Sequence, residues 1–389
     1  MIRPNLNNYE EAPVAIAIIY SEGLREYDFG PGHPFRGDRY EIFPNFLRER
    51  VPEDDNYHFI KAPPASDEDL ALICNKGYID FTCAYYKAAH DGTLDHVKFG
   101  LYQSMDNMPF DTPGKLEEAA RLIIGQAKMG CDLIHKGTYK KAISIGGGMH
   151  HAKSGFGEGF CLYNDVAFAA RYFIDTCKLQ RVLVLDTDAH AGNGTCEYFY
   201  RDPNVLFIDL HQDPHTLYPG TGFASEIGAD KGKGFTVNIP LPPNAGYDSY
   251  YRIFGEIVEP IVREFKPQII IRNGGSDPHP DDGLTDLGLP VRGFNMIGEK
   301  VRQLADEVCQ GKELDLIASG YNKRVLPYAW LALISGLGNW NIDVEEPEPV
   351  THKFHKDPAY AQTKIVEAEI KSNLKPYWKC FQPRGPLQF

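Results

Sequence analysis

Along most of this chain, short apolar runs alternate with segments in which apolar residues recur at helical spacing. The run "VLVL" at 182–185 is apolar at every position, whereas a strand with one face in water alternates apolar and polar residues. Strands buried on both faces occur mainly in parallel sheets, so the pattern predicts an α/β fold with a mainly parallel central sheet and helices on both faces. The expected strands are 14–20, 142–145, 182–185, 205–210, 235–239, 269–271 and 314–318, and the expected helices are 116–135, 166–174, 250–265, 294–308, 325–337 and 360–372.

The composition gives no indication of a second domain in the chain. Its 389 residues are 43% hydrophobic and show no internal repeat or low-complexity linker. We therefore expect one domain over 1–389, with a core at about 14–340 and an extension at about 341–389 that packs on the body or makes contacts in a homo-oligomer. The net charge of −13 argues against direct nucleic-acid binding and against binding to anionic membranes.

The eight cysteines are scattered without a CxxC pair, and no apolar run reaches transmembrane length. The first residues also lack the pattern of a secretory signal. These features predict free thiols and a cytoplasmic location. The loops at 27–40 and 102–114 are rich in Gly, Pro and Asp, which predicts ordered surface loops.

Unusual polar residues follow four of the expected strands. The segment "GGGMHH" ends in His150 and His151, "VLVLDTDAH" contains Asp186, Asp188 and His190, "RNGGSD" ends in Asp277, and "SGY" ends in Tyr321. Ligands of open parallel sheets bind beyond the carboxyl ends of the strands. Polar residues at four such ends therefore predict one shared site.

Three of these residues suit a single metal ion. Asp188 and His190 are two positions apart, so on an extended backbone their side chains point to one face. Taken alone, this pattern also fits a helix N-cap, but Asp277 adds a third ligand from another strand end. Three N/O ligands leave positions open for water and substrate, which is typical of catalytic zinc, and Fe²⁺ or Co²⁺ would fit the same ligands.

The paired histidines predict proton transfer beside the metal. A tandem His is rarely needed for packing, and an imidazole near activated water acts as a general base or acid once a partner fixes its tautomer. We expect Asp186 to orient one ring and Asn193 the other. Because a carboxylate makes imidazole more basic and an amide does not, His150 and His151 should titrate differently. Tyr321 could donate its hydroxyl to an oxyanion.

With these residues in view, the chain resembles the histone deacetylase superfamily, which includes acetylpolyamine amidohydrolases and acetoin-utilisation proteins. The resemblance covers about 14–340 and is carried, in order, by "YDFGPGHPFRGDRY", "GGGMHHAKSGFGEGFCLYND", "VLVLDTDAHAGNGT", "LHQDPHTLYPGTG", "GGSDPHPDDGLTDLGL" and "SGY". It implies the three-layer arginase–deacetylase fold.

The resemblance also implies roles for individual residues. Asp188, His190 and Asp277 match the zinc ligands, His150 and His151 the proton-transfer pair, and Tyr321 the tyrosine that polarises the amide carbonyl. Further matches are the substrate-binding residues Asp106, Gly159, Phe160, Tyr218 and Leu284, the acetate-pocket residue Arg39, and a structural potassium site formed by Asp186, Asp188, His190, Asp209 and Leu210.

The implied activity is hydrolysis of acetyl or other acyl amides by metal-activated water, on acylated lysine side chains of peptides or proteins or on small acylated amines. Acetylpolyamine or another small acylamide is the alternative substrate. Leu284 resembles the apolar rim position of lysine deacetylases, whereas a carboxylate there would favour a polyamine. The segment "HPDD" at 279–282 could lie near the mouth of the site or form an ordinary solvated turn, and the turn is the preferred interpretation.

Two other functions are less favoured. An arginase-type ureohydrolase needs a second carboxylate two residues after the ligand His, where this chain has Gly192. A catalytically weak scaffold that binds acylated lysine conflicts with the presence of every expected ligand. The chain departs from the family at Ala191, where many members have His, at Ser319, where Gly is common, and at Asp209, where Ser is common. These departures bear on substrate choice or rate.

Overall fold

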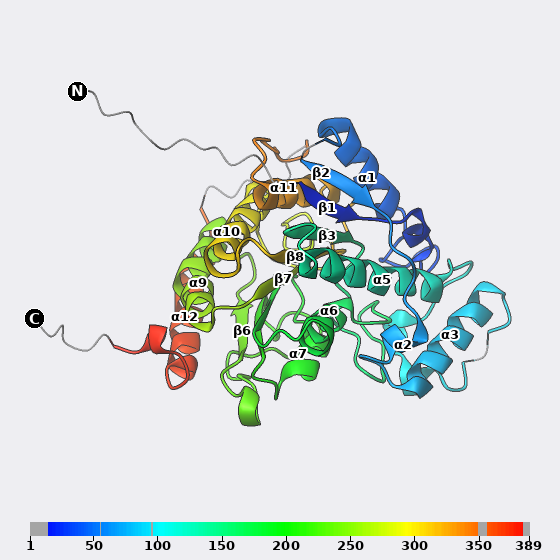
Figure 1. Ribbon diagram of the computed structural model, residues 1–389, viewed down its shortest axis with the longest axis horizontal. Coiled ribbons are helices and arrows are strands. Elements are labelled where there is room, and N and C mark those ends of the chain that lie inside the picture. Colours follow the sequence, from blue (N-terminus) through cyan, green and yellow to red (C-terminus); the bar gives the residue numbers. More distant parts are fainter. Residues whose placement is uncertain (1–14, 55, 95, 349–355, 384–389) are drawn as a thin grey trace, which may run out of the picture.

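The centre of the molecule is an eight-stranded sheet (Figure 1). The structure is a computed structural model that describes residues 15–54, 56–94, 96–348 and 356–383. All neighbouring strands are parallel, in the order β2-β1-β3-β8-β7-β4-β5-β6. The strands are β1 (Ile16–Ile19), β2 (Tyr57–Ile60), β3 (Lys141–Ile145), β4 (Val182–Asp186), β5 (Val205–Gln212), β6 (Thr236–Leu241), β7 (Ile269–Asn273) and β8 (Glu313–Ile317). The predicted α/β fold is confirmed, while Val14, included in the first expected strand, lies outside the described residues.

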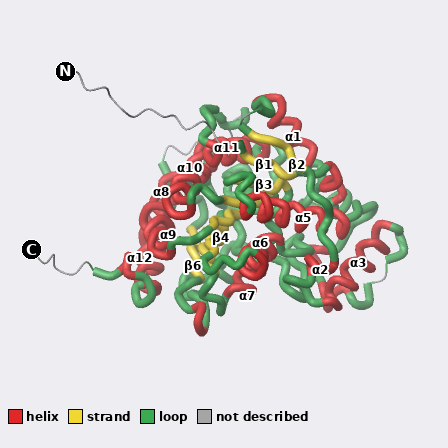
Figure 2. The backbone as a smooth tube through the Cα atoms, viewed as in Figure 1, coloured by secondary structure: helices red, strands yellow, loops and turns green. Residues whose placement is uncertain are grey.

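Helices cover both faces of the sheet, as Figures 1 and 2 show. Helices α5–α7 lie along one face, and α8–α11 lie along the other. The helices are α1 (Arg39–Arg50), α2 (Asp67–Leu70), α3 (Lys76–His90), α4 (Phe99–Tyr102), α5 (Leu116–His135), α6 (Asp165–Arg171), α7 (Asn193–Phe199), α8 (Tyr247–Ile253), α9 (Glu259–Phe265), α10 (Val291–Cys309), α11 (Leu326–Gly338) and α12 (Tyr360–Leu374). Two helices expected as continuous contain π-helical turns, at Tyr172–Thr176 after α6 and at Phe254–Val258 between α8 and α9.

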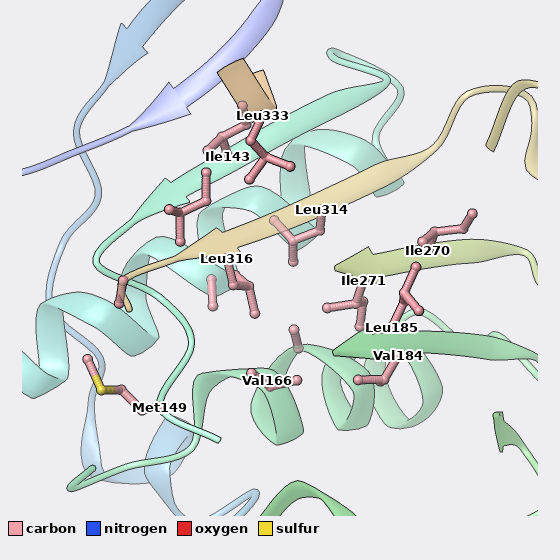
Figure 3. Close-up of a cluster of buried hydrophobic side chains, with 14 of the residues drawn as sticks. Ile143, Met149, Val166, Val184, Leu185, Ile270, Ile271, Leu314, Leu316 and Leu333 are labelled. Atoms are coloured by element: carbon pink, nitrogen blue, oxygen red, sulfur yellow. The ribbon is translucent and has the colours of Figure 1, made fainter. Parts of the chain in front are cut away.

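The continuously apolar strands are buried on both faces, as their sequence predicts. Val184 and Leu185 of β4 and Leu314 of β8 are fully buried. In Figure 3 they lie among apolar side chains from β3, β7, α6 and α11. This core fixes the central strands rigidly, and their carboxyl ends carry the polar residues of the candidate site.

Several elements between 20 and 110 were not predicted. Strand β2 is short, lies at the sheet edge and is only partly buried, so it lacks the apolar run that identifies the other strands. Helix α1 contains Pro44 and carries many charged side chains, which obscures its helical period. Helix α3 buries Tyr78, Tyr85 and Tyr86, so its inward face consists largely of tyrosines rather than aliphatic residues.

The expectation of a surface loop at 27–40 is wrong. Tyr27, Phe29, Phe35 and Tyr40 are buried, and α1 begins at Arg39 inside this range. The aromatic side chains outweigh the polar turn residues between them, since each buries a large apolar area. The segment 102–114 does lie at the surface in part, with Met105 69% and Phe110 46% exposed.

The C-terminal extension packs on the body through α12. Asp357 accepts hydrogen bonds from the backbone of Gly246 and Ser249, and Trp378 Nε1 donates to Gly234 O over 2.7 Å. Among the described residues, no helix is both long and apolar enough to cross a membrane. All eight cysteines are free.

Candidate metal centre and active site

The polar strand ends meet in the middle of the sheet. In the sheet order β3-β8-β7-β4, Ile145 pairs with Ile317 and Asp186 pairs with Asn273, so these four strands end at the same edge. Each expected residue follows one of these ends. The structure therefore brings together the side chains that the strand ends predict.

Asp188, His190 and Asp277 form a buried cluster of potential metal ligands. One donor atom from each lies within 4.8 Å of the others. His190 Nδ1 is 3.1 Å from both Asp188 Oδ1 and Asp277 Oδ2. Ser319 Oγ donates a hydrogen bond of 2.6 Å to Asp277 Oδ1, which fixes that carboxylate.

The donor chemistry of this cluster fits a divalent cation. Burial, and then the nearby Asp188 carboxylate, raise the pKa of Asp277 to about 8. Two carboxylates held this close and shielded from water favour a positive charge between them. One imidazole and two carboxylates are ligands that Zn²⁺ accepts, and Fe²⁺ or Co²⁺ can use them too.

The glycines before the paired histidines shape the turn that follows β3. Gly148 has φ 121°, and a Cβ there would lie 2.4 Å from Asn273 Oδ1. The backbone N–H groups of Gly148 and Met149 donate to the buried carboxylate of Asp165. The turn thus places His150 and His151 beside the cluster of Asp188, His190 and Asp277, as the glycine run predicts.

The two histidines have different partners. His150 Nδ1 is 2.8 Å from Asp186 Oδ2, and His151 Nδ1 is 2.8 Å from Asn193 Oδ1. These are the contacts expected from the sequence. The two Nε2 atoms face each other at 3.2 Å.

The pKa values of the two histidines shift in opposite directions. Burial lowers the pKa of His150, but the carboxylates of Asp186 and Asp188 outweigh it and raise that pKa to about 9. Burial, together with the nearby rings of His150 and His190, holds the pKa of His151 well below its ordinary value. The pair therefore combines one basic and one weakly basic imidazole.

Tyr321 lies in an aromatic surrounding next to these residues. Its ring is 6.0 Å from the Phe160 ring and 6.5 Å from the Phe35 ring, centroid to centroid. Burial, opposed by Arg39 and reinforced by Asp277 and Asp188, raises the pKa of Tyr321 well above its ordinary value. The phenol therefore keeps its proton at neutral pH and can donate it in a hydrogen bond.

The interpretation of residues 279–282 as a solvated turn is wrong. His279 is 3% exposed and Asp282 is 7% exposed. Asp282 accepts hydrogen bonds from the backbone N–H of Tyr321 over 2.7 Å and of Leu284 over 3.0 Å. Both ends of this segment are therefore buried, and the Asp282 carboxylate contacts the backbone that carries Tyr321.

Of the expected substrate-binding residues, Asp106 and Gly159 are joined by a hydrogen bond. Asp106 Oδ2 accepts a hydrogen bond of 2.8 Å from Gly159 N, and Phe160 follows directly. The Tyr218 ring lies 5.2 Å from the His151 ring and is 43% exposed. Leu284 is 38% exposed, and its backbone N–H donates a hydrogen bond to Asp282.

Comparison with known proteins matches this arrangement to one family. Residues 33–337 match the model of the histone deacetylase domain. This chain belongs to the histone deacetylase family. Within the family, it is 32% identical to a probable deacetylase of Archaeoglobus fulgidus, over 94% of this chain and 99% of that protein. It is 37% identical to the acetoin utilization protein AcuC of Staphylococcus xylosus, over 81% of this chain and 82% of that protein.

A solved structure of the family supports the same conclusion. The crystal structure of the HDA15 HD domain superposes with a TM-score of 0.79 at 25% sequence identity, over 95% of this chain and 97% of that one. The resemblance to the deacetylase family and its three-layer arginase–deacetylase fold are therefore confirmed. Together the matches support a hydrolase of the deacetylase and amidohydrolase type.

Two further expectations from the family can be located in the structure. Arg39 is buried, donates from Nη1 to Ala318 O over 2.8 Å, and has its Cζ 5.4 Å from the Tyr321 ring centroid. Asp209, at the expected potassium site, accepts a hydrogen bond from Gly192 N through Oδ2, and its Oδ1 is 3.0 Å from His211 Nδ1. Gly192 thus offers a backbone donor where an arginase would need a carboxylate.

Sequence reasoning missed three residues that contact the family's expected site residues. Asn273 Nδ2 donates to Asp186 Oδ2 over 2.9 Å. The sequence feature that could have indicated Asn273 is its position as a polar residue at the end of a buried strand. Asp282 was interpreted as a turn residue because Gly and Pro surround it. Glu158 accepts a hydrogen bond from Asn193, which lies 35 residues away, and no local pattern indicates this contact.

Proposed function

We propose that this chain removes acetyl or other acyl groups from lysine side chains of peptides or proteins, or from small acylated amines, with a Zn²⁺ ion held by Asp188, His190 and Asp277. The observation that carries the proposal is the buried ligand cluster with the two histidines beside it. When bound, such an ion polarises the amide carbonyl and lowers the pKa of a water molecule. Fe²⁺ or Co²⁺ are the alternative metals.

In this proposal, the chain's own residues handle the protons and the negative charge. One histidine of the pair accepts the proton of the attacking water, and a protonated histidine then serves the leaving amine. The Tyr321 hydroxyl donates to the carbonyl oxygen as negative charge develops there. Asp186 and Asn193 hold the two rings through their Nδ1 atoms.

The substrate would enter between Phe160 and Tyr218, whose rings lie near Tyr321 and His151 respectively. Asp106 and Gly159 would bind the substrate at the rim, and Leu284 would add an apolar contact. Arg39 would serve a pocket for the released acetate. The apolar Leu284 favours acyl-lysine, and acetylpolyamine or another small acylamide is the alternative substrate.

We also propose a structural K⁺ ion at Asp186, Asp188, His190, Asp209 and Leu210. Asp209 supports this site because its carboxylate is 1% exposed and lies beside the strand end that carries Asp186, with which it pairs in the sheet. A buried carboxylate oxygen of this kind suits a cation. The eight free thiols support a cytoplasmic location, since disulfides are rare there. A single domain over 1–389 and a homo-oligomer stay predictions.

The proposal is tested by turnover of an acyl-substrate panel with metal content measured alongside. Acetyl-, propionyl- and butyryl-lysine peptides are compared with N-acetylated polyamines. Tyr321→Phe should lower kcat by about 10²–10³-fold, as the loss of one oxyanion donor does elsewhere. Asp188→Ala should lose both the metal and the activity, and undiminished turnover in both variants would contradict the proposal.

A further inference from the structure

We infer that Glu158 is a positioning residue that fixes the tautomer of His151 by orienting the side-chain amide of Asn193. The inference deepens the proposed function, since it rests on His151 acting as a proton acceptor. Glu158 Oε1 accepts a hydrogen bond of 2.8 Å from Asn193 Nδ2. On its other side, Asn193 Oδ1 lies 2.8 Å from His151 Nδ1.

The direction of each hydrogen bond follows from the groups involved. An ionised carboxylate only accepts hydrogen bonds, so the atom of Asn193 that faces Glu158 must be the donating nitrogen. The oxygen of that amide then faces His151, where it can only accept. His151 Nδ1 must therefore carry the proton, and in the neutral ring Nε2 keeps its lone pair.

Nε2 is the atom that the site needs as a proton acceptor. It is the nitrogen that faces His150 Nε2, at 3.2 Å, and His150 Nε2 in turn lies 3.8 Å from Asp188 Oδ1 of the ligand cluster. If the Asn193 amide turned over, its nitrogen would face Nδ1 and favour the tautomer with the proton on Nε2. Glu158 prevents this because the turned amide would set an oxygen against the carboxylate.

Lys153 forms an ion pair with Glu158. Its Nζ is 3.0 Å from Glu158 Oε1, and the two side chains are 29% and 15% exposed. Both residues belong to the segment between the histidine pair and Phe160. Cys161 N donates to Glu158 O over 3.0 Å, so the turn that presents Phe160 also brings Glu158 to Asn193.

Three variants separate positioning from a simple structural ion pair. Glu158→Met removes the acceptor at similar length, so Asn193 can turn over. Glu158→Gln keeps a carbonyl oxygen that can accept from Asn193 Nδ2, and the Lys153 ammonium, 3.0 Å from the oxygen at this position, favours that orientation over the one in which the Gln amide donates. Lys153→Met removes the ion-pair partner and leaves the carboxylate in place.

We expect Glu158→Met to lower kcat about tenfold, in the range found when a residue that orients a metal-site group is removed. Its KM should stay within about twofold, and its thermal midpoint should barely move, because partly exposed ion pairs contribute little to stability. Glu158→Gln and Lys153→Met should both stay within about twofold of the parent kcat, because each retains an acceptor for Asn193.

The deciding measurement is the tautomer itself. Two-bond ¹H–¹⁵N correlation spectra of ¹⁵N-histidine-labelled protein, recorded without metal and with Zn²⁺, distinguish a proton on Nδ1 from one on Nε2, and a His151→Gln spectrum assigns the signal. The parent protein should show His151 protonated on Nδ1, and Glu158→Met should show a mixture of both tautomers.

Two results would overturn the inference. One is an unchanged His151 tautomer in Glu158→Met. The other is an equal loss of kcat and thermal stability in Glu158→Met and Lys153→Met, which would indicate a structural ion pair only. Inactivity of the parent protein on every acyl amide would instead reject the proposed function, and the spectra would still decide the role of Glu158.

Discussion

At the scale of single residues, the site shows how partners give two identical side chains different chemistry. His150 and His151 are adjacent in sequence and both buried, yet one faces a carboxylate and the other an amide. The first ring becomes more basic and the second less basic. The division between a basic and a weakly basic histidine thus depends on the Asp186 and Asp188 carboxylates near His150, and on burial and the neighbouring imidazoles at His151.

Asp282 is a second residue of this kind, because its carboxylate holds the backbone N–H of Tyr321. Replacing it with Ala removes two partly buried hydrogen bonds, to Tyr321 N and Leu284 N. We expect the free energy of unfolding to fall by about 1–3 kcal/mol, because these N–H groups lose their acceptor. We also expect kcat to fall about tenfold, since a loosened Tyr321 donates poorly.

Denaturant unfolding and steady-state kinetics measure both effects. Asp282→Asn, which keeps one acceptor oxygen, is the matched control and should lose less of each. An Asp282→Ala enzyme with parental kcat would show that Tyr321 is held without this carboxylate.

The clustering of Asp188, His190 and Asp277 could be predicted from the sequence, and the role of Asp282 could not, for a physical reason. Asp188 and His190 lie on one face because alternation along an extended backbone is local. Asp282 contacts a backbone group 39 residues away, and that contact exists only once β7 and β8 are neighbours. Its Gly- and Pro-rich surroundings have the composition of a solvated turn.

At the scale of elements, strands β3 and β8 carry a charged pair at the ends opposite the site. Lys141 pairs with Glu313 in the register, and its Nζ is 3.4 Å from Glu313 Oε2. Burial, with Asp315 nearby, outweighs Lys141 and raises the pKa of Glu313 to about 7. Glu313 Oε1 has no hydrogen-bond partner within the described residues.

This pair predicts a pH dependence of stability. Between the ordinary glutamate pKa and about 7, the folded chain keeps a proton on Glu313 that the unfolded chain releases. The stabilising effect of that proton is complete below this window and is lost as pH rises through it. Glu313→Gln should remove this component, so its stability relative to the parent should rise across the window and then level off.

Denaturant unfolding of parent and variant at several pH values between 4 and 8 measures the difference. Exposed Glu118 provides the control, since Glu118→Gln should leave the pH profile of the parent unchanged. A constant difference between Glu313→Gln and the parent would contradict the raised pKa.

Most of the central elements were predictable and most of the N-terminal ones were not. Strands such as β4 are apolar at every position because helices cover both faces, and that pattern can be read directly. The buried loop at 27–40 contains Gly and Pro between its aromatic residues, and its burial depends on packing against Phe160 and Tyr321. Local composition carries no record of that packing.

At the scale of the whole molecule, the parallel sheet gathers residues from 150 to 321 at one edge (Figure 1). The extension supports this edge from outside. Glu346 Oε2 is 2.9 Å from His279 Nε2, and Arg324 donates to Pro347 O over 3.1 Å. The extension therefore contacts the turn that contains Asp282. Its helix α12 also packs on β6 and α8.

The central claim is that Asp188, His190 and Asp277 jointly hold one catalytic metal ion. Anomalous diffraction from crystals of the active protein, recorded on both sides of the zinc absorption edge, tests it most directly. We expect a single peak bonded to these three side chains at about 2.0–2.2 Å from each ligand atom. Crystals of the active protein could instead show the three side chains in contact with one another, and no anomalous peak between them at the absorption edge of any transition metal. That result would contradict joint metal binding by Asp188, His190 and Asp277.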